Sequence, residues 1–158
     1  MKISDFLCTK AVLADLKSTT KDDVIAELVD LLINAGSIEK KRRKDVLEIL
    51  MAREALGSTA IGQGIAIPHG KYGSMKKLIG CLGISKQGIN FDSLDGEPAY
   101  IFFLLIAPVD SAGPHLKALA RISRLLKDKY IRETLKAAKD DKSILAIVQR
   151  EDGRLSKL

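Results

Sequence analysis

The nine residues AYIFFLLIA at 99–107 are apolar along their whole length. Side chains of a β-strand point alternately to its two faces, so a run that is apolar on both faces indicates a strand covered from both sides. This run therefore predicts the central strand of a sheet. At about half the length that spans a bilayer, it does not indicate insertion into a membrane.

Further strand-like and helical patterns lie on both sides of this run. Strands are predicted at 11–16 (AVLADL), 65–68 (IAIP) and 78–85 (LIGCLGIS), and residues 85–98 are turn-rich with a short strand inside. A first helix is predicted to begin at the capping pattern of Thr20 and Asp23 and to end at Gly36, and a second to run from Ser37 or Ile38 to near Gly57. Three more helices are predicted over 114–127, 130–138 and 141–150.

Helices and strands are thus interspersed along the chain. This order predicts an α/β fold, a three-layer sandwich in which a mixed parallel and antiparallel sheet is flanked by helices on both faces. With 158 residues the chain has the length of one domain.

The composition excludes several classes of protein and leaves the partner open. There are 26 Lys and Arg against 20 Asp and Glu, so the net charge of +6 favours acidic or phosphorylated partners. The basic run KKRRK at 40–44 could contact nucleic acid, but with 4% aromatic residues a solvated helix start is the favoured interpretation.

Cys8 and Cys81 match no metal spacing and are expected to be reduced. No signal peptide is recognisable at the N-terminus, which predicts a cytoplasmic protein.

The glycine-rich stretch GSTAIGQG at 57–64 precedes the predicted strand at 65–68. A nucleotide-binding loop would lead into a helix and carry a Gly-Lys-Ser/Thr ending, and this stretch does neither. Two interpretations remain, a flexible connector or a backbone that bends closely around an anion.

The two histidines are the candidate reactive groups. His69 follows Pro68, which places it in a restricted geometry at a strand end, and a neutral imidazole has a lone pair that can attack phosphorus or bind a metal. His115 lies in the first turn of the predicted helix at 114–127, after the central strand. Loops after strands of an α/β sheet form its binding crevice, so the two imidazoles are expected to meet. Each taken alone could be structural. No third metal ligand accompanies them at a suitable spacing, so no metal is predicted. No serine hydrolase motif is present either, so a hydrolase triad is not predicted.

Two motifs, REALGSTAIGQGIAIPHGK at 53–71 and HLKALARISRLL at 115–126, resemble the enzyme IIA domain of the fructose/mannitol class of the bacterial phosphoenolpyruvate:sugar phosphotransferase system. The similarity covers nearly the whole chain, and within the class it is greatest to the nitrogen-regulatory enzyme IIA. The resemblance implies a single enzyme IIA type 2 domain over 1–158 with its core at about 4–150. The loop departs from the family pattern at Ala60 and Gln63.

The resemblance also implies residue roles and partners. His69 would accept the phosphoryl group on Nε2, with His115 and Arg53 beside it and Ser58, Thr59 and Gly64 as candidate phosphate-lining residues. A histidine-containing phosphocarrier protein would be the donor, and no cofactor or metal is implied. The recipients would be regulatory targets such as transporters or kinases. An enzyme IIB of a sugar-uptake system is the alternative recipient, and a basic nucleic-acid-binding module is a remote alternative function.

Overall fold

Strand β6 (Ala99–Ala107) lies in the middle of a six-stranded sheet, as its apolar sequence predicts. The computed structural model describes residues 1–157. β5 (Ile79–Ile89) pairs antiparallel with one edge of β6, and two short strands, β3 (Ile65–Ala66) and β4 (His69–Lys71), pair parallel with its other edge. The outer strands are β1 (Leu7–Leu13), parallel to β5, and β2 (Ala60–Gly62), antiparallel to β3.

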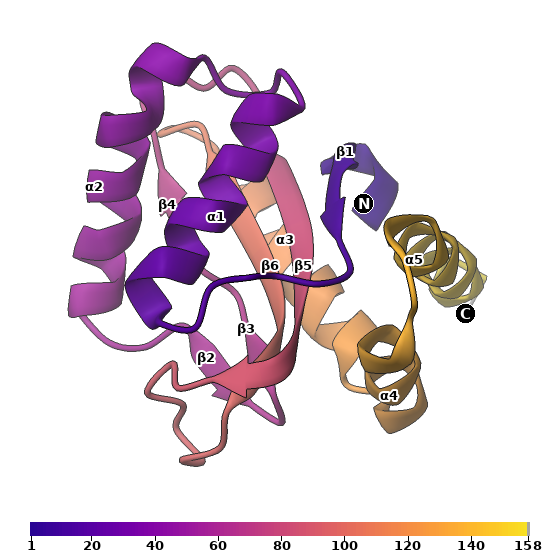
Figure 1. The fold of residues 1–158 in the computed structure, drawn as a ribbon. Helices are drawn as coiled ribbons and strands as arrows, with labels where there is room; N and C mark the ends of the chain where they lie inside the picture. Colours follow the sequence, from indigo (N-terminus) through magenta and orange to yellow (C-terminus); the bar gives the residue numbers. More distant parts are fainter. Residues whose placement is uncertain (158) are drawn as a thin grey trace.

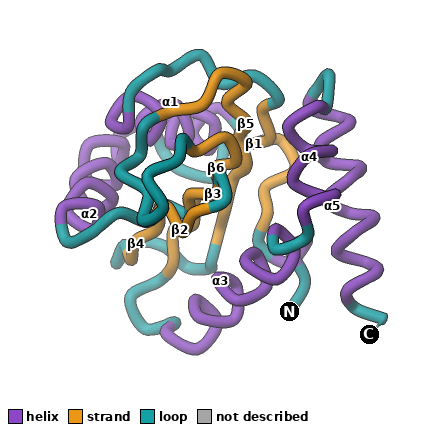
Figure 2. Tube along the Cα trace, turned by 90° about the horizontal axis from the view of Figure 1, so that it is seen from below, coloured by secondary structure: helices purple, strands orange, loops and turns teal. Residues whose placement is uncertain are grey.

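Helices cover both faces of this sheet (Figure 1). One layer holds α1 (Lys21–Asn34) and α2 (Arg43–Ala55), and the other holds α3 (Ala112–Leu126), α4 (Lys129–Ala137) and α5 (Asp141–Leu155). Figure 2 shows the strands between α2 on one side and α5 on the other. Two short 3-10 turns, Ile3–Asp5 and Lys40–Arg42, precede β1 and α2. The predicted α/β three-layer sandwich with a mixed sheet is therefore confirmed.

The helix starts follow from side-chain caps. The Thr20 hydroxyl accepts a hydrogen bond from the amide of Asp23 at 3.3 Å, as the sequence predicts, and Asp128 and Asp140 cap α4 and α5 in the same manner. Each cap satisfies an amide that the first helical turn leaves without a partner. Gly36 follows the end of α1 with φ 81°, a conformation that favours glycine.

Several predicted boundaries are wrong. β1 begins at Leu7 rather than at residue 11. The register with β5 shifts between Leu7 and Val12, so the buried and exposed side chains of this strand do not alternate regularly in the sequence. The second helix begins at 40–43 instead of at Ser37 or Ile38, since the Ile38 side chain is buried in the core ahead of the helix. No separate strand lies in 85–98; β5 instead continues to Ile89 through a bulge that includes Gly88 at φ 84°.

The basic run at 40–44 forms the start of α2, as favoured from the sequence. Its arginines are paired with carboxylates: Arg42 Nε lies 3.2 Å from Glu39, and Arg43 Nε lies 2.7 Å from Asp30. Within residues 1–157, no helix has the length and apolar character that a membrane span requires.

A buried carboxylate on α5 links this helix both to α3 and to the N-terminal turn. The Asp152 carboxylate on α5 lies 2.6 Å from Arg121 Nη2 on α3 and accepts a hydrogen bond of 2.8 Å from the amide of Ile3. Asp152 is buried, so both partners are needed to compensate the desolvation of its charge.

Candidate functional site

His69 is the first residue of β4 and pairs in register with Leu105 of β6. The sequence places this histidine beyond the end of a strand, whereas the structure places it within the sheet. The reason is that β3 and β4 both pair with the same edge of β6 and are separated only by Ile67 and Pro68. After this short interruption the chain resumes its pairing with β6 at His69. Although Pro68 has no N–H, its carbonyl accepts a 2.9 Å hydrogen bond from the Leu105 amide.

A backbone contact fixes the tautomer of His69. Its Nδ1 lies 2.7 Å from the carbonyl oxygen of Ile67. A carbonyl can only accept a hydrogen bond, so Nδ1 carries the proton. The lone pair of the neutral ring is then on Nε2.

His115 lies in the first turn of α3 and faces His69. The two ring centroids are 5.3 Å apart, and the rings are inclined by 80°. His115 is 6% exposed, and its Nε2 is a buried side-chain atom with no hydrogen-bond partner within residues 1–157. A buried polar group in that position costs free energy unless a ligand or partner satisfies it.

The surroundings of both imidazoles favour the neutral form. Burial lowers the pKa of His69, and the positive charge of Arg53 acts in the same direction, against the Ile67 carbonyl and Glu54, which raise it. Burial also lowers the pKa of His115, with His69 and Lys71 acting in the same direction. Both rings are therefore unprotonated on one nitrogen at neutral pH.

Arg53 lies in the last turn of α2, close enough for its charge to act on His69. Its Nη1 donates a 2.8 Å hydrogen bond to the carbonyl of Gly57, which holds the guanidinium at the start of the glycine-rich segment. The neighbouring Glu54 is buried, and it is paired with Lys21 Nζ at 3.0 Å. The sequence reasoning missed Glu54, although it directly follows Arg53 in the first motif.

The three candidate phosphate-lining residues hold the local structure instead. Ser58 Oγ donates to the Phe91 carbonyl at 2.6 Å, and the Thr59 hydroxyl donates to Glu54. Gly64 accepts a hydrogen bond from the amide of Ile101, four positions along β6 from the partner of His69, or about 13 Å away. The structure therefore does not bring Gly64 to His69, and the two hydroxyls already have partners.

Gly70 is a further residue that positions His69. A Cβ atom at this position would lie 2.7 Å from Cγ2 of Ile49 on α2. Real carbon atoms do not approach so closely, so β4 can pack against α2 at this distance only with glycine here. Its neighbours His69 and Lys71 then point to the opposite face, toward α3.

The site is open to a partner and has no metal-binding cluster. Lys71 is exposed, as are Leu116, which follows His115, and Val109 in the loop before α3. Among the described residues, no group of three His, Cys, Asp or Glu side chains could hold a metal ion. Cys8 and Cys81 carry free thiols.

Comparison with known proteins relates this arrangement to enzymes IIA. The chain is 39% identical over 148 residues to a nitrogen regulatory protein of Bradyrhizobium diazoefficiens, covering 94% of this chain and 95% of the relative. It is 37% identical over 152 residues to the fructose-specific EIIABC component of Bacillus subtilis, covering 96% of this chain but 24% of that larger protein.

The crystal structure of the nitrogen regulatory protein IIA-Ntr from Neisseria meningitidis has the same fold. Its TM-score is 0.81 at 34% identity, with coverage of 92% of this chain and 98% of that one. Residues 5–151 match the model of the family described as the phosphoenolpyruvate-dependent sugar phosphotransferase system, EIIA 2. The chain therefore belongs to this EIIA 2 family and is a phosphotransferase component of the enzyme IIA type.

Proposed function

We propose that the chain is a phosphoryl carrier in which Nε2 of His69 accepts a phosphoryl group from a histidine-containing phosphocarrier protein. The observation that carries this proposal is the 2.7 Å contact between His69 Nδ1 and the Ile67 carbonyl, which leaves the lone pair on Nε2. The lowered pKa of His69 keeps that lone pair free at neutral pH.

The transfer needs no proton movement at His69. The P–Nε2 bond forms as the P–N bond of the donor breaks, and the donor nitrogen leaves with the electron pair of that bond. Nδ1 keeps its proton and continues to donate it in the hydrogen bond to the Ile67 carbonyl, and this bond stabilises the positive charge that the ring gains. Such a step depends mainly on alignment and on neutralising the phosphoryl oxygens.

His115 and Arg53 are the groups proposed to bind those oxygens. An N–H at His115 Nε2 has no acceptor within the described residues, and a phosphoryl oxygen would supply one. Arg53 uses Nη1 on Gly57 and has further N–H groups in a planar fork that suits a phosphoryl group. The glycine-rich segment contributes by holding Arg53; Ser58, Thr59 and Gly64 are not needed as direct ligands.

We further propose that the output is regulatory, in a nitrogen-related branch of the phosphotransferase system in the cytoplasm, with 1–158 acting as one EIIA type 2 domain and its core at about 4–150. The similarity to nitrogen regulatory proteins over nearly their whole length supports this. Target proteins such as transporters or kinases would distinguish the two phosphorylation states. The comparable identity to a fructose-specific component favours a second candidate, transfer onward to an enzyme IIB.

The test is incubation with phosphoenolpyruvate, enzyme I and a phosphocarrier protein, followed by intact mass and fragmentation. One phosphate on His69, absent in His69→Ala, is the expected result, and a phosphate on Ser58 or Thr59 would contradict the assignment. Adding a fructose-type enzyme IIB then separates the two outputs, because only a sugar-uptake component would lose its phosphate to that protein rapidly.

A further inference from the structure

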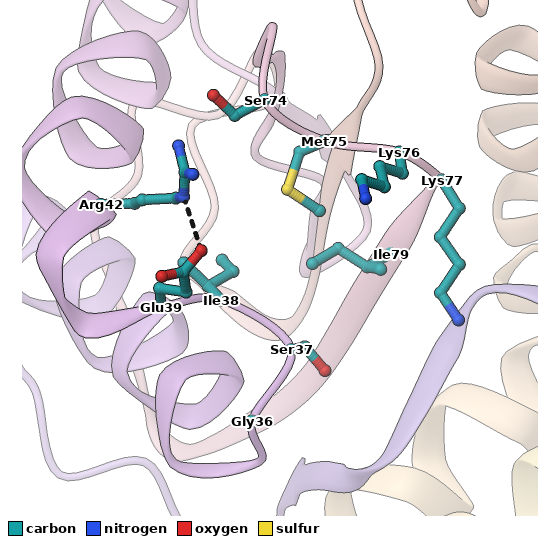
Figure 3. A pocket seen from close by; sticks show the side chains of 10 residues that line it. All are labelled: Gly36, Ser37, Ile38, Glu39, Arg42, Ser74, Met75, Lys76, Lys77 and Ile79. Carbon is teal, nitrogen blue, oxygen red and sulfur yellow. Dashed lines mark hydrogen bonds and ion pairs between the residues drawn. The ribbon is translucent and has the colours of Figure 1, made fainter.

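A pocket of about 520 Å³ opens between the connection from α1 to α2 and the loop from β4 to β5 (Figure 3). Its size is within the range of sites that bind small molecules. Residues 36–39 and Arg42 line it on one side, and residues 74–77 with Ile79, the first residue of β5, line it on the other.

This pocket is separate from the site at His69. Its floor residues Ile38 and Ile79 belong to the core between the sheet and the helices α1 and α2. His69 and His115 lie toward α3, on the other face of the sheet, and none of the residues that surround them lines the pocket. A ligand could therefore occupy the pocket without contacting the proposed phosphorylation site.

Positive charge is in excess around the pocket. Lys76 and Lys77 are exposed, and neither forms an ion pair with a side chain of the described residues. The third cation, Arg42, is fixed by two contacts, Nε with Glu39 at 3.2 Å and Nη1 with the Tyr72 hydroxyl at 3.3 Å. Glu39 is the one carboxylate among the lining residues, and it is also paired with Lys41 at 3.3 Å.

Arg42 nevertheless keeps donor capacity. Five N–H groups belong to a guanidinium, and the contacts with Glu39 and Tyr72 use two of them. Because Tyr72 is buried, it holds the arginine side chain in place at the wall of the pocket. A guanidinium held in this way binds an anionic group at lower entropic cost than a free side chain.

The remaining lining is apolar with two hydroxyls. Figure 3 shows the side chains of Met75 and Ile79 directed into the pocket, below Ser74 and beside Lys76. An ion such as inorganic phosphate would use only the cationic rim. A ligand that also has an apolar part would cover Met75 and Ile79 as well.

We propose that this pocket binds a small organic anion, with its phosphate or carboxylate group on Arg42 and Lys76 and its apolar part on Met75 and Ile79. The probe is phenyl phosphate, titrated into the ¹⁵N-labelled full chain and followed by NMR. Saturable shifts are expected at the amides of residues 74–77 and of Arg42. Phenol, which lacks the anionic group, and inorganic phosphate, which lacks the ring, should each bind more weakly.

Paired variants separate a formed site from general attraction by charge. Lys76→Met should weaken the binding of phenyl phosphate by about fivefold. Glu39→Gln, which removes the carboxylate paired with Arg42, should strengthen this binding by a similar factor. Lys44→Met and Glu48→Gln change the net charge equally on α2 outside the pocket and should change the affinity little. The same titration in His69→Ala should give the same shifts at 74–77.

The opposing results are equally defined. If Lys44→Met weakens binding as much as Lys76→Met, or if Lys41, Arg43 and Lys44, which do not line the pocket, shift as much as Arg42, the anion is attracted only by net charge. If no saturable shift at 74–77 appears at millimolar phenyl phosphate, or if the shifts there disappear in His69→Ala, there is no separate site.

Discussion

Substituting Gly70 by alanine tests how the packing of β4 against α2 positions His69. The new Cβ would lie 2.7 Å from Ile49 Cγ2 and 3.7 Å from Leu50 Cδ2. Carbon atoms pack at about 3.5–4.0 Å, so β4 and α2 must separate by about 1 Å. Overpacking of this kind costs about 1–3 kcal/mol of stability.

The displacement acts directly on the neighbouring residue, His69. A shift of about 1 Å in a reacting group can slow a reaction by about 100-fold. We expect Gly70→Ala to unfold at lower urea concentration and to accept phosphate from a phosphorylated carrier up to about 100-fold more slowly in rapid-quench measurements. Gly153→Ala is the matched control, because within residues 1–157 nothing outside its own chain neighbours and helix backbone lies within 4 Å of its Cβ position in α5. It should raise stability by about 0.5–1 kcal/mol and leave transfer unchanged.

The double variant identifies the cause. Ile49→Ala removes the methyl group that the new Cβ would meet, so Gly70→Ala should cost less stability and less rate in that background. If Gly70→Ala has the wild-type urea midpoint and rate, or if its cost is the same with and without Ile49, then contact with α2 does not position His69.

Four further predictions concern the site itself. His69→Ala should abolish phosphorylation and keep the circular dichroism spectrum, whereas phosphate elsewhere in this variant would show a different acceptor. Arg53→Lys should slow single-turnover transfer by about tenfold or more, because an ammonium lacks the planar fork; an unchanged rate would make Arg53 a bystander. His115→Gln should leave His69 phosphorylated but slow its transfer, and His115→Ala should be slower, by about 100-fold or more, while phosphate mapped to His115 would reverse the two roles. Burial lowers the pKa of both histidines in the folded chain, so the unfolded chain takes up protons first as the pH falls below about 6.5. Protonation then favours the unfolded state, and stability against urea should decline below that pH. The rate at which His69 accepts phosphate should stay level from about pH 8 to about pH 6.5, because its ring remains neutral.

Much of the architecture follows from local patterns. The run at 99–107 is apolar on both faces because helices cover both sides of β6, and Thr20 begins α1 because its hydroxyl satisfies a free amide. Both patterns involve only residues close together in the sequence, so the strand and the helix start can be predicted from the sequence alone. The proximity of His69 to His115 was also predictable in outline, since the chain reaches His69 after β3 and His115 after β6, and these two strands are neighbours in the sheet.

What could not be predicted depends on contacts between distant residues. Strands β2 and β4 have three residues each and form only because β3 and β6 offer free backbone groups to them. The hydroxyl of Thr59 resembles a phosphate ligand in the motif, but a buried Glu54 binds it in the folded chain. No local pattern could reveal that Gly70 faces a methyl group of Ile49.

The buried carboxylate of Asp152 also constrains the order in which the chain can fold during synthesis. Its two partners, the Ile3 amide and Arg121, are made long before residue 152 leaves the ribosome. Until then, the Ile3 amide lacks its acceptor and Arg121 lacks its counter-charge, so neither the first turn nor α3 is anchored to the end of this face. Helix α5, which follows every other helix and strand within residues 1–157, therefore completes the face of the sheet that holds His115. A nascent chain should protect its first strand from proteases only after α5 has emerged, and ribosome-bound chains of increasing length would reveal that step.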